Sequence, residues 1–471
     1  MTAIPIIPVR APAPRGMLAR LGDAMRRHRR TVVIVQWAVI AFYAVIVTVP
    51  AFLPLPPDGA SIVSNFTLFA QFAFWGVWWP LVIASTMLVG RAWCGIFCPE
   101  GALTEFASRH GLGRPIPRWM RWGGWPFVAF AITTIYGQLV SVYEYPKAVL
   151  LILGGSTLAA VAVGFVYGKG KRVWCRHLCP VNGVFALLAK VAPVHFRTDE
   201  AAWRAHLGHT PRVDCAPLVD LRHLASASEC HACGRCSGHR GAIALASRSP
   251  NQEILALAPG GVPAPTALLL LFGVLGIATG AFQWTSSPWF IAMKQALAEW
   301  LVNHDAPTLL GDGAPWWLLT HYPEASDVFT WLDGLCIVAY VGLVALVIGG
   351  AAFASLAAAA RVAGNGQVAG RPRFDWRTLA MGLVPLGGIG LVLGLSMLTV
   401  TQLRGERIVI EGIGMVRALL LAAGVGWSAW LGARIVWRAN AGAAARSLAS
   451  ALYAIPLALV ASSWYLVFWR W

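Results

Sequence analysis

Charged residues are scarce in this chain of 471 residues: Asp, Glu, Lys and Arg together make up 12% of it, whereas an ordinary soluble domain carries roughly 25%. This scarcity excludes a simple soluble domain. The chain also lacks a dinucleotide fingerprint and a phosphate-binding glycine-rich loop with its Lys and Ser or Thr, which excludes an ATPase of that kind. None of its 11 histidines falls in the interior of a long apolar run, so we expect no membrane haem.

Long apolar runs are what the chain has instead, because 58% of its residues are hydrophobic. Several of these runs reach the roughly 20 residues that a helix needs to cross a bilayer. We therefore expect an all-α polytopic membrane protein with about nine transmembrane helices. The expected spans are 31–53, 66–90, 125–143, 147–168, 263–285, 335–358, 379–402, 412–433 and 447–468.

The placement of basic residues predicts the orientation of these spans. With the N-terminus inside, 31 of the 37 Lys and Arg residues fall in the tail or in the four connections that would also lie inside. Cytoplasmic loops of membrane proteins are enriched in Lys and Arg, so we expect the N-terminus inside and the C-terminus outside. The net charge of +17 then reflects topology. We expect the lipid bilayer, and no nucleic acid, as a partner.

Eight of the nine cysteines lie between positions 94 and 236. They form the groups Cys94-x3-Cys98-Pro99, Cys175-x3-Cys179-Pro180, and Cys215 followed by Cys230-x2-Cys233-x2-Cys236. Thiols at such spacings are iron–sulfur ligands more often than disulfides, and the cytosol keeps thiols reduced. Cys336 stands alone at the start of a span, which favours a buried, inert thiol.

Two of these groups belong to an internal repeat with an offset of 81 residues. Segments 91–99 and 172–180 share Arg, Trp, both Cys and Pro, and each follows a helical hairpin. The two halves therefore have parallel topology, which would bring both motifs together at the inner surface of the membrane. Residues four apart share a helix face. We expect a second metal or iron–sulfur centre there, on Cys94, Cys98, Cys175 and Cys179. A zinc site or a plain helix junction is the alternative.

The third group lies in the long polar connection 169–262, which predicts a small cytoplasmic ferredoxin-like insert. A two-cluster ferredoxin has two runs of C-x2-C-x2-C-x3-C-P, and the fourth Cys of each run binds the cluster of the other run. By this count one cluster has lost all its ligands, at Ala205, Gly208, Pro211 and Arg240. The other has kept all four, so we expect one [4Fe–4S] cluster on Cys215, Cys230, Cys233 and Cys236. A zinc knuckle with four cysteine ligands is the alternative.

These features divide the chain into four parts. We expect a basic cytoplasmic tail at 1–30, a four-helix membrane electron-transfer domain at 31–192, the ferredoxin-like module at 193–262 and a five-helix membrane domain at 263–471. The last part contains an outer loop, 286–334, with six acidic residues against a single lysine. Such a loop suits the docking of a metalloprotein or a cation. An ordinary solvated loop, acidic because basic residues stay inside, is the alternative.

The paired Cys-x3-Cys-Pro motifs followed by a ferredoxin module resemble the NapH/NosR/CcoG-type membrane polyferredoxins, a 4Fe-4S binding family. The resemblance covers about residues 31–250. It implies a multi-pass protein of the bacterial inner membrane that passes electrons between the cytoplasmic side or the quinone pool and a periplasmic partner. Members of the group commonly carry two ferredoxin clusters, whereas this chain keeps ligands for one.

The length and layout of residues 263–471 are similar to the polyferredoxin subunit of FtrABCD-type ferrous iron uptake systems. This similarity implies an electron-transfer component of an oxidoreductase system, used in iron transport. Its partners would be a periplasmic redox or metal-binding protein, with a metal permease subunit or quinone. Two other functions are open: a ferredoxin-type quinol dehydrogenase component of a respiratory or amine-oxidising pathway, and a thiolate copper- or zinc-handling membrane protein without electron transfer.

Overall fold

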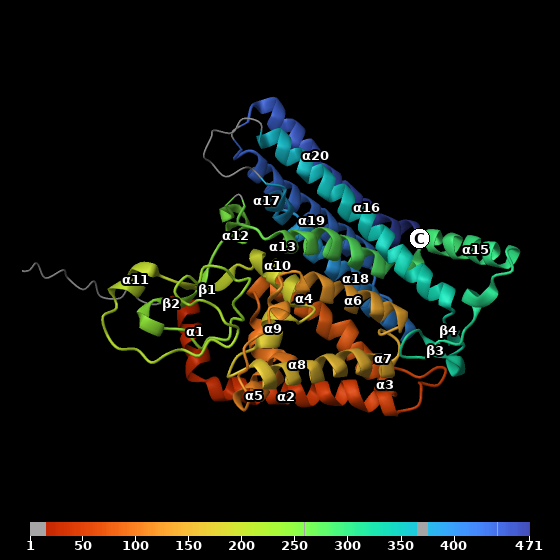
Figure 1. Cartoon of the computed structure of the whole chain (residues 1–471), viewed down its shortest axis with the longest axis horizontal. Coiled ribbons are helices and arrows are strands. Elements are labelled where there is room, and N and C mark those ends of the chain that lie inside the picture. Colours follow the sequence, from red (N-terminus) through yellow and green to blue (C-terminus); the bar gives the residue numbers. More distant parts are fainter. Residues whose placement is uncertain (1–15, 259, 365–374, 440) are drawn as a thin grey trace, which may run out of the picture.

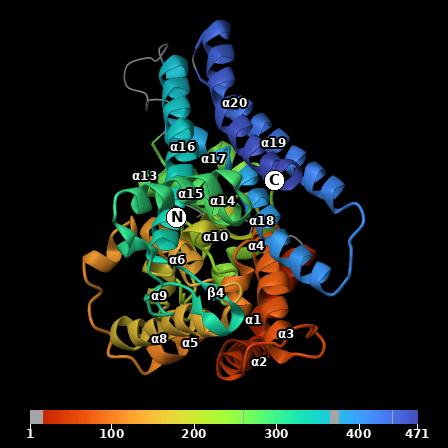
Figure 2. The same ribbon diagram turned by 90° about the vertical axis from the view of Figure 1, so that its right-hand side faces the viewer.

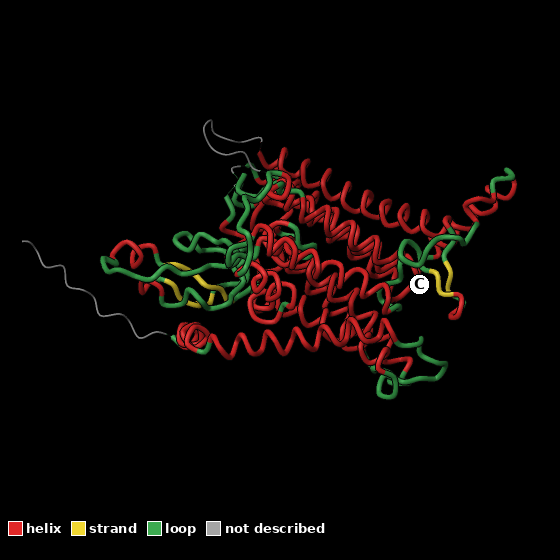
Figure 3. The backbone as a smooth tube through the Cα atoms, turned by 60° about the horizontal axis from the view of Figure 1, so that its bottom comes forward, coloured by secondary structure: helices red, strands yellow, loops and turns green. Residues whose placement is uncertain are grey.

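Apolar helices form the body of the molecule, and small mixed structures lie at its two ends. The computed structural model describes residues 16–258, 260–364, 375–439 and 441–471. The four strands of these residues occur as one pair at each end of the helix bundle (Figures 1 and 3). Helix α1 (Met17–Arg27) lies at the end that carries β1 and β2, which we call the module end.

Eight helical segments in the described residues are long and apolar enough to cross a membrane. They are Arg29–Phe52, Phe66–Val89, Pro146–Tyr167, Ala264–Ser286, Trp331–Gly364, Val384–Gly405, Ile413–Val436 and Ala443–Arg470. The helices within them are α2 (Arg29–Thr48), α3 (Phe66–Gln71), α4 (Trp79–Val89), α7 (Pro146–Val149), α8 (Gly155–Tyr167), α13 (Ala264–Leu268), α14 (Ala278–Gln283), α16 (Trp331–Gly364), α18 (Val384–Gly405), α19 (Ile413–Val436) and α20 (Ala443–Tyr465). Eight of the nine expected spans therefore correspond to helices of spanning length.

The remaining expected span, 125–143, is shorter than the sequence indicated. Helix α6 (Trp125–Leu139) has 15 residues and so rises roughly 22 Å, less than a hydrocarbon core of about 30 Å. It ends there because Ser141 adopts a positive φ of 48°, which turns the chain out of the helix. Its start packs beside Gly183, and the Leu139 carbonyl accepts a hydrogen bond from the Thr320 amide at 2.8 Å near the opposite end.

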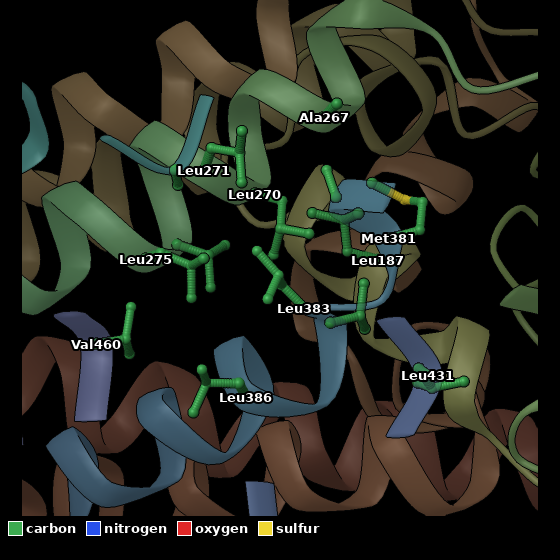
Figure 4. Close-up of a cluster of buried hydrophobic side chains, with 14 of the residues drawn as sticks. Leu187, Ala267, Leu270, Leu271, Leu275, Met381, Leu383, Leu386, Leu431 and Val460 are labelled. Carbon is green, nitrogen blue, oxygen red and sulfur yellow. The ribbon is translucent and has the colours of Figure 1, made fainter. Parts of the chain in front are cut away.

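One large apolar cluster joins the repeat-bearing half to the C-terminal helices (Figure 4). Leu187 comes from the short helix α10 (Asn182–Leu188), and Leu270 and Leu275 come from the segment after α13. Met381 closes α17 (Trp376–Met381), and Leu431 comes from α19. The five C-terminal helices therefore share one core with the domain that carries both repeated motifs.

The module end contains a two-stranded antiparallel sheet, β1 (Val194–Thr198) with β2 (Ile243–Ser247). Two short helices flank it, α11 (Glu200–Ala205) and α12 (Gln252–Ala256). Helix α1 covers the sheet, where Gly22 lies so close that an added Cβ would sit 2.9 Å from the Ser237 Oγ. The expected basic tail 1–30 is therefore in part a folded component of the module; residues 1–15 lie outside the described residues.

The opposite end includes the residues between α14 and α16 (Figure 2). It contains α15 (Pro288–Asn303) and the strand pair β3 (His321–Tyr322) and β4 (Asp327–Val328). Two of the six acidic residues of the loop 286–334 have internal partners. Tyr145 donates to the Asp327 carboxylate at 2.8 Å, and Asp333 pairs with Lys294. Part of the acidity of this loop therefore serves the fold.

Close packing at Gly432 gives a test of the bundle. An added Cβ at Gly432 would lie 2.1 Å from a ring carbon of Tyr453, whereas one at Gly426 on the same helix would meet nothing within 4 Å. We predict that Gly432→Ala destabilises the protein by about 1–3 kcal/mol through overpacking. Gly426→Ala should be neutral or slightly stabilising. Thermal unfolding of the detergent-solubilised protein measures both, and equal behaviour of the two variants would contradict this packing.

Candidate functional site

Each repeated motif is followed by a short helix. This short helix begins beside the middle of a long helix and not beside its end. Helix α5 (Pro99–Arg109) follows Cys98 and runs alongside α8 in the same direction. The Thr104 hydroxyl donates to the Ala160 carbonyl at 2.7 Å, and Glu100 bonds the side chain of Ser156. Because Ser156 precedes the end of α8 at Tyr167 by eleven residues, Cys98 lies roughly 16 Å inward along the helix axis.

The second motif has the same arrangement. Helix α10 follows Cys179 and Pro180, and Phe185 packs against Trp79 of α4 with ring centroids 6.4 Å apart. Cys179 itself packs on the apolar cluster around Ala160 of α8. The sequence placed both motifs at the membrane surface, and the structure instead places Cys98 and Cys179 well inside the ends of the spanning helices.

Neither motif is one regular helix, in contrast to the expectation from the i, i+4 spacing. Cys98 is extended, with φ −71° and ψ 117°, because the ring of a following proline disfavours the α conformation. In both repeats the amide of the second cysteine donates to the tryptophan carbonyl five residues earlier, Cys98 to Trp93 at 2.9 Å and Cys179 to Trp174 at 3.0 Å. The two motifs therefore share a wide turn that ends at the proline.

The arginine of each motif donates a hydrogen bond to the other motif or to a residue just after it. Arg91 of the first motif donates to the Asn182 side chain after the second motif, at 2.6 Å. Arg172 of the second motif donates to the Cys94 carbonyl of the first. Each arginine segment also holds the module: Arg91 donates to the Ser228 carbonyl and the Arg172 amide to the Ala216 carbonyl, both at 2.8 Å. The expected approach of the two motifs is confirmed.

Of the four cysteines of the repeated motifs, Cys94 and Cys175 are buried, whereas Cys98 and Cys179 are partly exposed. Cys94 and Cys175 lie near enough to Cys98 to interact with it electrostatically. The guanidinium group of Arg91 lies 4.0 Å from the Cys94 sulfur. This is a thiol-rich, water-poor site with cationic groups beside it, which suits thiolates and an anionic cluster.

The other four cysteines converge in the module. Cys215, Cys230, Cys233 and Cys236 line one cavity of about 20 Å³. A tight loop brings three of them together, since Ala232 and Gly234 both have positive φ, 46° and 75°. The Ala232 amide donates to the Cys230 sulfur at 3.3 Å. Burial, then the adjacent Cys233, raises the pKa of the Cys230 thiol to about 12. Amide hydrogen bonds to sulfur are one of the means by which proteins tune iron–sulfur centres.

Other side chains stand at the positions where a companion cluster would have its cysteine ligands. Arg240 stands where a fourth cysteine would be, and its guanidinium lies 4.9 Å from the ring centre of Trp203. The His239 ring also packs edge-on against Trp203, with ring centroids 5.4 Å apart. His231, beside the ligand candidate Cys230, is buried.

The two cysteine groups meet at Gly95. An added Cβ there would lie 2.0 Å from the His231 carbonyl oxygen and 3.0 Å from the Cys233 amide nitrogen. Gln36 of α2 donates to the Gly95 carbonyl at 3.0 Å, which fixes this turn. The sequence did not single out Gly95. Its one signal is a break in the repeat, because the equivalent position of the second motif holds Arg176.

Glu105 is a second residue that the sequence did not reveal. Its carboxylate pairs with Arg172 at 2.9 Å, with Arg235 of the module at 2.5 Å and with Arg109 at 3.0 Å. Burial by itself would raise the pKa of Glu105, but Arg172 and Arg235 lower it to about 2. Glu105 thus ties the second motif to the module by charge.

The chemical identity of these side chains fits an iron–sulfur group, although the distances between them in this structure do not. Within the four described stretches of the chain, no three His, Cys, Asp or Glu side chains are close enough to hold a metal ion as they stand. Each cysteine group nevertheless supplies four thiols, all of them buried or partly buried and none in a disulfide. Four thiolates are the ligands of a [4Fe–4S] cluster. Cys336 is buried in α16, away from both groups, as expected.

Comparison with known proteins supports the same class. Residues 71–122 and 151–198 match the family described as "4Fe-4S binding domain", and each matched segment contains one repeated motif. The chain is also 24% identical over 236 residues to "Putative electron transport protein YccM" of Escherichia coli (strain K12). That alignment covers 43% of this chain and 65% of the relative, which is less than two thirds of its length. No solved structure matches the chain. Together these findings support an iron–sulfur protein of electron transport, embedded in a membrane by several apolar helices.

Gly95 gives the first prediction about this site. We expect Gly95→Ala to push the module away from the first motif, because the Cβ has no space against His231, and to destabilise the docked state by about 1–3 kcal/mol. Limited proteolysis of the module and thermal unfolding measure this. Gly155→Ala, whose Cβ would meet nothing within 4 Å, is the matched control. Equal protease sensitivity of the two variants would refute the contact.

Glu105 gives a prediction about pH. Because its folded pKa of about 2 is below that of an unfolded glutamate, its contribution is fully present above roughly pH 4.5 and is lost as the pH falls toward 2. This amounts to about 3 kcal/mol. Glu105→Gln should flatten the dependence of unfolding on pH between 5 and 3 and lower stability at pH 7, since Arg172 remains buried without its partner. Glu200→Gln, in an exposed pair, should keep the wild-type slope.

Proposed function

We propose that this chain is a membrane electron carrier with two adjoining centres. Cys215, Cys230, Cys233 and Cys236 would hold one [4Fe–4S] cluster, and Cys94, Cys98, Cys175 and Cys179 a second iron–sulfur or metal centre. The single observation that carries the proposal is the contact at Gly95, where the first motif touches the backbone of Cys233 without a side chain between them. Electron transfer falls steeply with distance, so two redox centres gain most from such an approach.

The residues around the two groups have separable roles in this proposal. An iron–sulfur cluster supplies the capacity to take up and release one electron. Arg91 and Arg172 offset negative charge on the thiolates, while Glu105 prevents a surplus of positive charge between the groups. Burial of Trp174 and Cys175 keeps water from the second motif. The chain thus binds, spaces and insulates the two centres.

The direction across the membrane follows from the positive-inside rule. We propose that the module faces the cytoplasm and that the loop 286–334 faces the periplasm of a bacterial inner membrane. We propose that the short helix α6 crosses as the ninth span, with its Leu139 end beside Thr320 of the loop 286–334. The motifs of Cys98 and Cys179 would then carry electrons part of the way from the cytoplasm or the quinone pool toward a periplasmic partner.

The pathway is proposed from the resemblance to polyferredoxins. Residues 263–471 have the layout of the FtrABCD-type subunit, and we therefore favour ferrous iron uptake, with a periplasmic redox or metal-binding protein and a metal permease subunit as partners. Deletion of the gene should then impair growth on limiting iron and leave growth on nitrate unchanged. The reverse result would favour a quinol dehydrogenase component of a respiratory pathway.

Iron analysis tests the two centres directly. Anaerobically purified protein should be brown and contain iron and acid-labile sulfide. Cys233→Ser should remove about four iron atoms per chain, the content of one [4Fe–4S] cluster, and Cys98→Ser should alter a different part of the EPR signal. Cys336→Ser, which changes the ninth cysteine, is the control and should keep the full iron content. Colourless protein that contains zinc or copper would instead support metal handling without electron transfer.

A further inference from the structure

An arginine-lined cleft lies where the companion cluster of the module has been lost. It is a cavity of about 360 Å³, and Pro211 and Arg240, two of the positions without cysteine, line it. Its walls come from the α1–α2 junction and from two module loops. The guanidinium groups around it belong to Arg26, Arg29, Arg212, Arg235 and Arg240.

The charge of this cleft is poorly balanced. Asp214 is the one carboxylate that lines it, and that side chain pairs with Lys171, outside the cleft, while remaining 59% exposed. Arg235 is bound by Glu105. Among the described residues, Arg26, Arg29 and Arg212 have no ion-pair partner, and the Nε of Arg240 is buried without a hydrogen bond. Several guanidinium groups with free donors, gathered around one cavity, fit an anion with several oxygen acceptors.

A second cavity adjoins the first and leads to the cysteines. It has a volume of about 180 Å³, shares Arg26, Arg29 and Arg235 with the cleft, and is also lined by Gly95 and Cys233. Val32 and Val33 of α2 supply an apolar wall. A ligand whose anionic end occupied the arginine cleft could thus extend its other end to the place where the two cysteine groups meet.

We infer that the arginine cleft binds a phosphate-bearing ligand, whose remaining part lies in the adjoining cavity against Cys233. Phosphate is favoured over a simple halide because it presents several oxygens to planar guanidinium groups, in the geometry that arginine binds best. The phosphate can come from a soluble molecule or from the head group of an anionic lipid, since Arg29 also begins the first spanning helix. This inference goes beyond the proposed function and does not require iron.

The test uses the full chain in phosphatidylcholine nanodiscs, titrated with inorganic pyrophosphate in a calorimeter. Arg26→Gln and Arg212→Gln should each weaken binding about tenfold or more, the usual effect of losing a hydrogen bond between charged groups. Arg27→Gln and Arg222→Gln are matched controls, because these arginines are exposed like Arg26 and Arg212 but do not line the cleft. Controls that weaken binding as much as the cleft variants would show general surface attraction and overturn the inference.

A second measurement separates the two sources of phosphate. Phosphatidylglycerol retained by the wild type in native mass spectrometry, and lost in Arg212→Gln, would identify a lipid head group. Pyrophosphate binding without retained lipid would identify a soluble ligand. Absence of both would overturn the inference. Loss of iron with intact pyrophosphate binding would defeat the proposed function alone, so the two proposals fail separately.

Discussion

Two breaks in helical structure, well inside the ends of the long apolar helices, impose the main constraint on this protein. Within a bilayer, backbone groups outside a helix must find partners in the protein, because lipid offers none. In the first break, the Cys94 carbonyl accepts a hydrogen bond from Arg172, and the Gly95 carbonyl accepts one from Gln36. The turn can therefore exist only when the second repeat and α2 are packed around it. The same contacts bring the eight cysteines into two neighbouring groups.

A buried carboxylate offsets the free-energy cost of burying arginines at this site. Arg172 is 2% exposed, and a buried guanidinium without a partner would be strongly unfavourable. Glu105 meets it and Arg235 together, so one carboxylate serves the membrane domain and the module at once. The arrangement couples the position of the module to the second motif. The ion pairs of Glu105 and the close contact at Gly95 therefore both hold the module against the membrane domain.

Much of the membrane architecture could be predicted from apolar runs, because a helix that crosses a bilayer needs roughly 20 consecutive residues that are mostly apolar. Eight expected spans correspond to long helices, whereas span 125–143 was overestimated because the turn at Ser141 is invisible to hydropathy. The grouping of the cysteines from the repeat and the ferredoxin spacing stays a prediction, although Cys215, Cys230, Cys233 and Cys236 line one cavity. The depth of Cys98 could not be foreseen, because it depends on α5 returning beside α8. The contact of Gly95 with His231 is a long-range steric fit that no local pattern encodes.

The packing of Arg240 on Trp203 has a consequence for how electrons could be stored. With Arg240 in place of a fourth cysteine and ligands for one cluster only, the module of the proposed carrier would have capacity for a single electron. A donor that releases electrons in pairs would have to wait until the first had moved on through the Gly95 junction before delivering the second. The throughput of the module would then be governed by how quickly it empties, and the half-oxidised donor would need protection from side reactions in the meantime.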